Sequence, residues 1–245
     1  MTPLMEVRNV SKHFGGLRAV SAVSFAVQTG EIIGLIGPNG AGKTTLFALL
    51  SGFLPLTTGQ IRFQGNSITG FPPRRLCHVG IARTFQVVQP FREMTVFENV
   101  KVASVFGDPM KHPKDVTEQE VNDILKGTGL VTLANHYPSS LSLPQLKRLE
   151  VARAMATRPR LLLLDEVLAG LNPMEVKKSL PFIQSLNADH GITILMIEHN
   201  LRAIMEVCNR ILVLNFGLLI FDGTPEAAVR DADVIQAYLG RNASA

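Results

Sequence analysis

The sequence is poor in the residues that mark nucleic-acid grooves and disulfide frameworks. It has no tryptophan, two tyrosines and two cysteines in 245 residues, and its net charge is +4. The absence of tryptophan, the scarcity of tyrosine and the lack of a dense Lys/Arg run argue against a nucleic-acid partner, because such grooves stack bases beside clustered positive charge. Cys77 and Cys208 form no Cys-x-x-Cys pair, so we expect two reduced thiols, buried or half-buried.

The sequence also lacks a hydrophobic run long enough to span a bilayer. The most apolar stretches, 160–171 and 210–221, are interrupted by Asp165-Glu166 and by polar residues 215–217. No charged, apolar and small leader segment opens the chain. Hydrophobic residues are 46% and charged residues 18%, which is typical of a globular protein with a substantial core. We therefore expect a cytosolic protein that meets membranes only through partners.

The most informative feature present is a phosphate-binding loop. Residues 37–44 read Gly-Pro-Asn-Gly-Ala-Gly-Lys-Thr, after a run that predicts a strand (31–36) and before one that predicts a helix (44–50). Such a turn aims backbone N–H groups and the positive end of the helix dipole at one point, where the polyphosphate of ATP binds. We expect Lys43 to contact the outer phosphates and Thr44 to coordinate Mg²⁺. The predicted nucleotide-binding residues of this segment are Gly37, Pro38, Asn39, Gly40, Ala41, Gly42, Lys43, Thr44 and Thr45.

The remaining patterns predict an α/β fold in one domain. Alternating residues at 4–30 and a hairpin-like unit after the phosphate loop indicate an antiparallel β subdomain. Towards the C-terminus, continuous apolar strands alternate with helices, which indicates a mainly parallel sheet covered on both faces. Helical patterns dominate in between. The predicted domain spans 1–245, with a nucleotide-binding core at 1–89 and 156–245 and an inserted helical subdomain at 90–155.

Three polar side chains are expected beside the phosphate loop. Asp165 and Glu166 follow the apolar run 161–164, and the carboxyl ends of parallel strands form the ligand crevice of such sheets. Asp165 would hold Mg²⁺, directly or through water, while Glu166 polarises the attacking water. His199 ends the next apolar strand, 192–199, where its imidazole could reach a γ-phosphate oxygen.

Gln86 follows another short apolar segment and could sense Mg²⁺ or the attacking water through its amide. The predicted catalytic residues are therefore Glu166, His199 and Gln86, and the predicted metal ligands are Thr44, Gln86 and Asp165.

The order of these motifs resembles the ATP-binding cassette (ABC) family of transporter ATPases over essentially the whole chain. The resemblance implies ATP hydrolysis that energises transport, with ATP bound between two cassettes arranged head to tail. It implies that Phe14 stacks on adenine, that Val20 lines the ribose side, and that Ser142 and Gln145 of a signature segment contact nucleotide. Residues 169–172 match the loop through which two cassettes signal to each other.

Within that family, four segments are similar to LivG-type subunits, the ATPases of branched-chain amino acid importers. These segments are residues 83–86, 91–99, 197–200 and 233–240. The resemblance implies a second ABC ATPase subunit in a heterodimer, two permease subunits, and an external solute-binding protein acting indirectly. It places the chain peripherally on the cytoplasmic face of the inner or plasma membrane, with the region from Gln86 to about Phe106 contacting the permease.

Other readings remain open. Amide, urea and lipopolysaccharide transporters share much of this pattern, and so do soluble ABC proteins that act on nucleic acid or ribosomes. The soluble proteins usually carry two cassettes or a long coiled-coil insert, which this chain lacks. A nucleotide-binding regulatory subunit is a further alternative, although it would have no need of Glu166 and His199.

The signature segment departs from the family pattern. Residues 141–145 read Leu-Ser-Leu-Pro-Gln, where relatives typically have Leu-Ser-Gly-Gly-Gln. Pro144 has no backbone N–H to give to a phosphate, and a hydrogen bond to a charged group contributes about 1.5–3 kcal/mol. Proline also suits the first turn of a helix, so we expect the fold to survive. In a heterodimer this predicts one competent ATP site, carrying this chain's catalytic residues, and one impaired site; a homodimer would have the defect twice. Val167 also replaces the proline that usually follows Asp-Glu.

Overall fold

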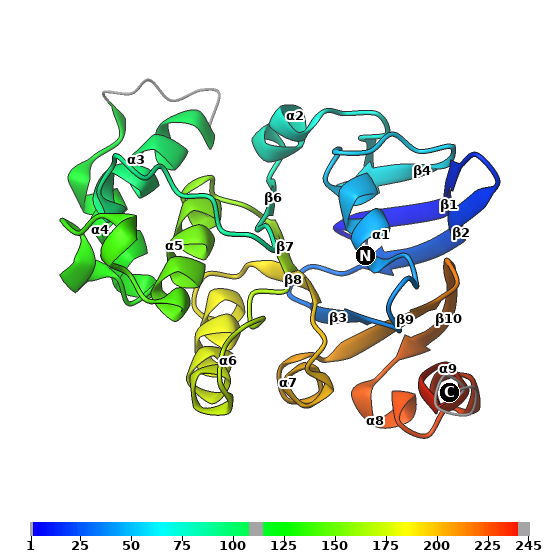
Figure 1. Ribbon diagram of the computed structural model, residues 1–245. Helices are drawn as coiled ribbons and strands as arrows, with labels where there is room; N and C mark the ends of the chain where they lie inside the picture. Colours follow the sequence, from blue (N-terminus) through cyan, green and yellow to red (C-terminus); the bar gives the residue numbers. More distant parts are fainter. Residues whose placement is uncertain (1, 108–114, 240–245) are drawn as a thin grey trace.

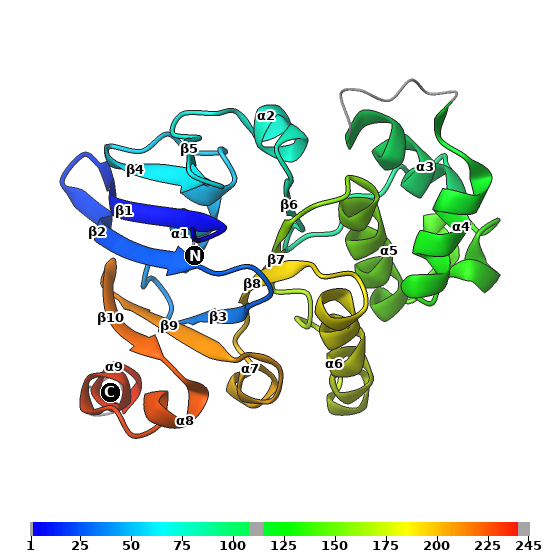
Figure 2. The ribbon, with the colours of Figure 1, turned by 180° about the vertical axis from the view of Figure 1, so that it is seen from behind.

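Two β-sheets and a surrounding set of helices make up the structure, a computed structural model that describes residues 2–107 and 115–239 (Figures 1 and 2). The smaller sheet is antiparallel with the order β2-β1-β4-β5. Its strands are β1 (Met5–Phe14), β2 (Leu17–Val27), β4 (Thr58–Phe63) and β5 (Asn66–Ser67).

The larger sheet is parallel except at one edge. Its order is β10-β9-β3-β8-β7-β6, and only the β9–β10 pair is antiparallel. The strands are β3 (Ile32–Ile36), β6 (Ile81–Arg83), β7 (Leu161–Asp165), β8 (Thr193–Ile197), β9 (Arg210–Asn215) and β10 (Leu218–Gly223). The carboxyl ends of β3, β6, β7 and β8 therefore meet at one edge, as the positions of the polar motifs require.

Some of the helices pack against the sheets, and others form a separate group at one side. In the described residues they are α1 (Lys43–Leu50), α2 (Pro73–His78), α3 (Val96–Gly107), α4 (Glu118–Gly127), α5 (Leu143–Ala156), α6 (Pro173–Ala188), α7 (Leu201–Val207), α8 (Pro225–Ala228) and α9 (Ala232–Leu239), with 3₁₀ turns at Val131–Leu133 and Pro138–Ser140. Figure 1 shows α3, α4 and α5 gathered at one side of the sheets. None of the helices in the described part of the chain is long and apolar enough to cross a membrane.

The core of the larger sheet is sorted by the two-residue period of its strands. On β3, Ile33 and Leu35 pack with α1 and the smaller sheet, whereas Ile32 and Ile36 pack with α6 and α7 on the opposite face. All five residues of β3, β7 and β8 are buried. This double coverage explains why these strands read as continuous apolar runs. The helices α3, α4 and α5 have a third cluster of their own, centred on residues such as Val100.

The predicted α/β fold, with a mainly parallel sheet, an antiparallel β unit and inserted helices, is confirmed. One strand boundary differs from the expectation. β8 ends at Ile197, two residues before His199. α5 begins at Leu143 and continues through Ala156, because Ser142 caps it and Pro144 fits the first turn. Gly240, the last residue of a segment named above, lies outside the described residues.

Candidate active site

The phosphate loop, residues 37–44, joins β3 to α1 in a conformation that needs glycine. Gly37 and Gly42 have φ of 148° and 101°. A Cβ at Gly37 would lie 2.1 Å from the Leu214 carbonyl oxygen, and one at Gly42 would lie 2.3 Å from the Ala19 carbonyl oxygen. Because backbone atoms cannot give way as flexible side chains do, neither position accepts a larger residue.

Lys43 folds back over the loop. Its buried Nζ donates to the carbonyl oxygens of Gly37 at 2.6 Å and Pro38 at 3.0 Å. Thr44 is exposed and Thr45 half-buried at the start of α1. The ammonium group therefore lies within the loop that would receive the phosphates, next to the positive end of α1.

The three predicted catalytic side chains lie together although they come from three different strand ends. Glu166 Oε1 is 2.7 Å from His199 Nε2, and Gln86 Nε2 donates to Glu166 Oε2 at 2.8 Å. Glu166 has the left-handed φ of 50°, a conformation that costs a non-glycine residue free energy and is often found at functional sites. The structure thus gives one carboxylate two polar partners, an arrangement that fixes its orientation.

These groups and the phosphate loop face one cavity of about 570 Å³, called the nucleotide cavity below. Its volume is within the range of small-molecule and cofactor sites. It is lined by Phe14, Leu17, Arg18, Ala19, Asn39, Gly40, Ala41, Gly42, Lys43, Thr44, Thr45, Gln86, Glu166, His199 and Phe216. The strand-end rule therefore brings Gln86, Glu166 and His199 to the loop, as expected from the sequence.

The two residues expected on the base and ribose sides differ in placement. Phe14 lies at the end of β1, is 47% exposed and lines the nucleotide cavity, with Lys12 Nζ 5.0 Å from its ring centroid. Val20 is fully buried in the core. The structure therefore gives no support to the expected ribose contact of Val20, because the alternation of β2 turns its side chain inward. Leu17, Arg18 and Ala19 line the cavity instead.

Asp165 forms an ion pair and does not line the nucleotide cavity. Arg83 Nη2 donates to Asp165 Oδ2 at 2.7 Å, and both side chains are nearly buried. Arg83 also donates to Ser51 Oγ at 2.9 Å, and the Asp165 N–H donates to Thr84 Oγ1 at 3.0 Å. Of the predicted metal ligands, Thr44 and Gln86 line the cavity, and Asp165 does not.

The oxygen donors that line the nucleotide cavity suit a Mg²⁺ ion that is also bound by substrate phosphates, rather than a metal site made of protein ligands alone. Among the described residues, no group of three or more His, Cys, Asp and Glu side chains could hold a metal ion. Mg²⁺ prefers oxygen donors and usually binds through one or two protein groups, waters and substrate phosphates. The hydroxyl of Thr44 and the amide oxygen of Gln86 are suitable donors, since Gln86 uses its nitrogen for Glu166.

Two buried charged residues of α5 contact the segments that carry the predicted catalytic residues, and sequence reasoning missed both. Lys147 Nζ donates to the carbonyl oxygens of Gln86 at 2.9 Å and Glu166 at 3.3 Å. The Phe85 N–H donates to Glu150 Oε1. Lys147 and Glu150 are three residues apart and so share a helix face. Two charged residues at this spacing on a helix next to the core were the available signal.

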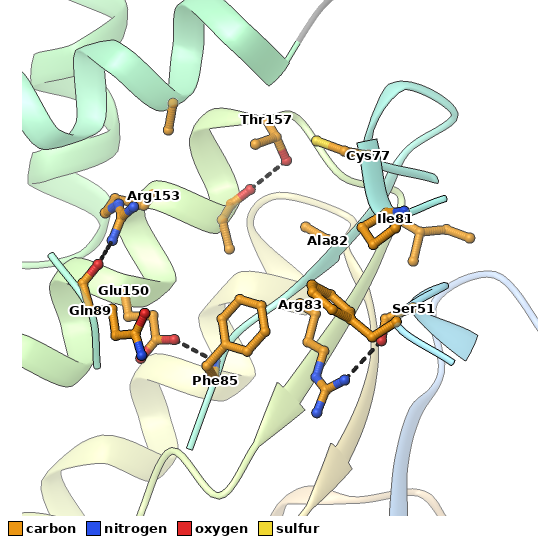
Figure 3. Close-up of a pocket in the computed structure, with 14 residues that line it drawn as sticks. Ser51, Cys77, Ile81, Ala82, Arg83, Phe85, Gln89, Glu150, Arg153 and Thr157 are labelled. Atoms are coloured by element: carbon orange, nitrogen blue, oxygen red, sulfur yellow. Dashed lines mark hydrogen bonds between the residues drawn. The ribbon is translucent and has the colours of Figure 1, made fainter. Parts of the chain in front are cut away.

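A second cavity, of about 360 Å³, lies between β6 and α5 and is called the lateral groove below (Figure 3). Figure 3 shows Phe85, Glu150 and Arg153 around it, with Arg153 donating to the Gln89 carbonyl oxygen at 2.7 Å. Glu150 Oε2 is buried without a hydrogen-bond partner among the described residues. Burial raises the pKa of Glu150 from 4.5 to about 7, because the charged form loses solvation.

The signature segment lies outside the nucleotide cavity of its own chain. Ser142 and Leu143 are exposed at the start of α5, and Gln145 Oε1 accepts from the Ser142 N–H at 2.8 Å. Pro144 is in the first turn of this helix. None of these residues lines the nucleotide cavity.

Comparison with known proteins agrees with this geometry. The family profile described as "ABC transporter" matches residues 20–169, and one described as "Branched-chain amino acid ATP-binding cassette transporter" matches 219–244. The chain is 40% identical to the high-affinity branched-chain amino acid transport ATP-binding protein BraF of Pseudomonas aeruginosa and 42% identical to LivG of Escherichia coli. Each alignment covers 97% of this chain and 98% of the relative.

A solved structure also matches along nearly the whole chain. The ADP conformation of MJ1267, an ATP-binding cassette of an ABC transporter, aligns with a TM-score of 0.87 at 32% identity. The alignment covers 98% of this chain and all of that one.

Proposed function

This chain belongs to the ATP-binding cassette transporter family, as the order of its motifs predicted, and we propose that it hydrolyses ATP to energise a membrane importer of branched-chain or other amino acids. The observation that carries the hydrolytic part is the group of Gln86, Glu166 and His199 facing the phosphate loop in one cavity. The solute is proposed from the similarity to BraF and LivG and from the match of residues 219–244.

The proposed roles follow from the contacts. Lys43 and the loop N–H groups bind the phosphates, and Phe14 stacks on adenine. Glu166 orients and polarises the attacking water, while His199 and Gln86 hold its carboxylate and reach towards the γ-phosphate. Mg²⁺, when bound with ATP, neutralises developing charge on the phosphates. Thr44 and Gln86 would hold it, and Asp165 would act through water from its ion pair with Arg83.

A dimer with a second, different cassette is proposed for the working state. The signature residues Ser142, which is exposed, and Gln145, which is half-buried, would contact nucleotide on the partner's phosphate loop. Pro144 cannot donate the hydrogen bond that glycine gives there. The site built from this chain's Lys43 and Glu166 would be the competent one, provided that the partner has an intact signature.

The lateral groove, which Gln89 and Ala103 help to line, is proposed to receive a cytoplasmic loop of the membrane permease. Its floor includes Phe85, which precedes Gln86, so a docked segment would act directly next to a catalytic residue. We propose that 90–155 moves as a helical subdomain against the core at 1–89 and 156–245. The chain would then sit peripherally on the cytoplasmic face of the membrane and meet an external solute-binding protein only indirectly.

Co-purification tests this proposal. The tagged chain is isolated from gently solubilised native membranes, and the proteins that accompany it are identified by mass spectrometry. Two permease subunits and a second cassette are expected, with genes for amino-acid uptake beside them. Recovery with ribosomes, or alone at full expression, contradicts the transporter assignment. Recovery with permeases for a lipid or an amide would support the role as a transport ATPase and would contradict the proposed amino-acid solute.

A further inference from the structure

A second aromatic side chain, Phe216, lines the nucleotide cavity, and the sequence motifs assign it no role. It occupies the two-residue turn between β9 and β10 together with Gly217. In Figures 1 and 2 the tip of this hairpin lies beside β2. Phe216 is 76% exposed, and it shares the cavity with Phe14 and the phosphate loop.

The backbone of this turn is unfavourable for phenylalanine. Phe216 and Gly217 have φ of 45° and 79°, the pattern of turns in which asparagine, aspartate or glycine is preferred at the first position. A bulky residue in the left-handed region costs about 1–2 kcal/mol. Because the side chain is also largely exposed, little burial within this chain offsets that cost.

The turn is fixed against the phosphate loop. The Gly217 N–H donates to the Ala41 carbonyl oxygen at 3.0 Å, and the Ser21 N–H donates to the Gly217 carbonyl oxygen at 2.8 Å. A Cβ on Gly217 would lie 2.9 Å from the Ala19 carbonyl oxygen. The turn is thus held between the phosphate loop and β2, and Phe216 is held at the cavity's rim.

We propose that Phe216 is a second contact for the purine base, completing with Phe14 an aromatic pair around it. This inference rests on the proposed ATP site. A base has two apolar faces, and each face can stack on an aromatic ring. Binding of the base would bury the exposed ring of Phe216 and so offset the strain of its turn.

Paired binding measurements test the proposal. Dissociation constants of Mg²⁺–ATP and of Mg²⁺–tripolyphosphate, which has no base, are measured by calorimetry for the full chain and for Phe216→Asn. Loss of one base contact predicts about 5- to 150-fold weaker ATP binding and unchanged tripolyphosphate binding. Asparagine favours the left-handed turn, so the melting temperature of Phe216→Asn should equal or exceed that of the unsubstituted chain.

Two matched variants complete the experiment. Phe216→Tyr keeps the ring and should retain ATP affinity. Leu218→Asn alters a residue of the same hairpin that is 52% exposed but does not line the cavity, and it should leave both affinities unchanged. Unchanged ATP affinity in Phe216→Asn would overturn the proposal. So would equal weakening of ATP and tripolyphosphate, which would mean that the turn merely shapes the phosphate loop. An unsubstituted chain that binds neither ligand would instead refute the ATP site itself.

Discussion

Replacing Lys147 should slow ATP hydrolysis without much effect on ATP binding. Lys147 is only 6% exposed, and its ammonium group joins α5 to the backbone of Gln86 and Glu166. In Lys147→Met the apolar stem remains and two carbonyl oxygens lose a charged donor. Each such hydrogen bond contributes about 1.5–3 kcal/mol. If the loss of one of these hydrogen bonds raises the free energy of the transition state by that amount, kcat falls about 10- to 100-fold.

The KM for ATP should change less than about threefold, because Lys147 donates to Gln86 and Glu166 and does not line the nucleotide cavity, whereas Lys43 belongs to the phosphate loop that lines it. Phosphate release by the assembled transporter at a series of ATP concentrations measures both constants. Lys147→Gln keeps one donor group, so its kcat should lie between those of the unsubstituted protein and Lys147→Met. Lys126→Met, at the exposed end of α4, should have the kcat and KM of the unsubstituted protein. An unchanged kcat would refute the positioning role. A rise in KM equal to the fall in kcat would point to general damage of the site.

Three other substitutions give distinct outcomes. Glu166→Gln should lower kcat by about 10²–10⁴-fold while ATP binding persists, since it removes the base and keeps the shape; loss of binding in calorimetry would contradict this. Pro144→Gly should raise ATPase activity of the heterodimer up to about ten- to a hundredfold if the proline impairs the partner's site, and unchanged phosphate release would rule that out. Glu150→Gln should stabilise the fold by an amount that grows between pH 4.5 and pH 7 to about 3 kcal/mol. The sign follows because the folded chain binds the Glu150 proton more tightly, with its pKa raised from 4.5 to about 7, so deprotonation on raising the pH costs stability. Urea denaturation at pH 5 and pH 8 measures the difference in unfolding free energy between Glu150→Gln and the unsubstituted protein. An equal difference at the two pH values would contradict this assignment.

The sequence predicts the centre of the site because its residues follow strands. A continuous apolar run places its last residue at the edge of a parallel sheet, which is why the positions of Glu166, His199 and Gln86 beside the phosphate loop could be predicted. The phosphate loop is also local, since its glycine conformations depend on neighbouring backbone. The fold class followed from the same periodicities.

The remaining contacts depend on which distant segments meet. The Arg83–Asp165 pair joins residues 82 positions apart, and no spacing rule predicts that Arg83 rather than solvent faces this carboxylate. Val20 was placed at the ribose by resemblance, whereas the register of β2 turns it into the core. Phe216 lies at a hairpin tip that reaches the phosphate loop only through the pairing of β9 with β3.

ATP-driven uptake by the reconstituted complex tests the central claim most directly. The chain, its partner cassette and the two permeases are placed in proteoliposomes with the solute-binding protein, and uptake of radiolabelled leucine, isoleucine and valine is followed with ATP. Uptake should require ATP and should be abolished by Glu166→Gln in this chain alone. Uptake that continues in Glu166→Gln, or ATP hydrolysis that none of these solutes stimulates, would contradict it.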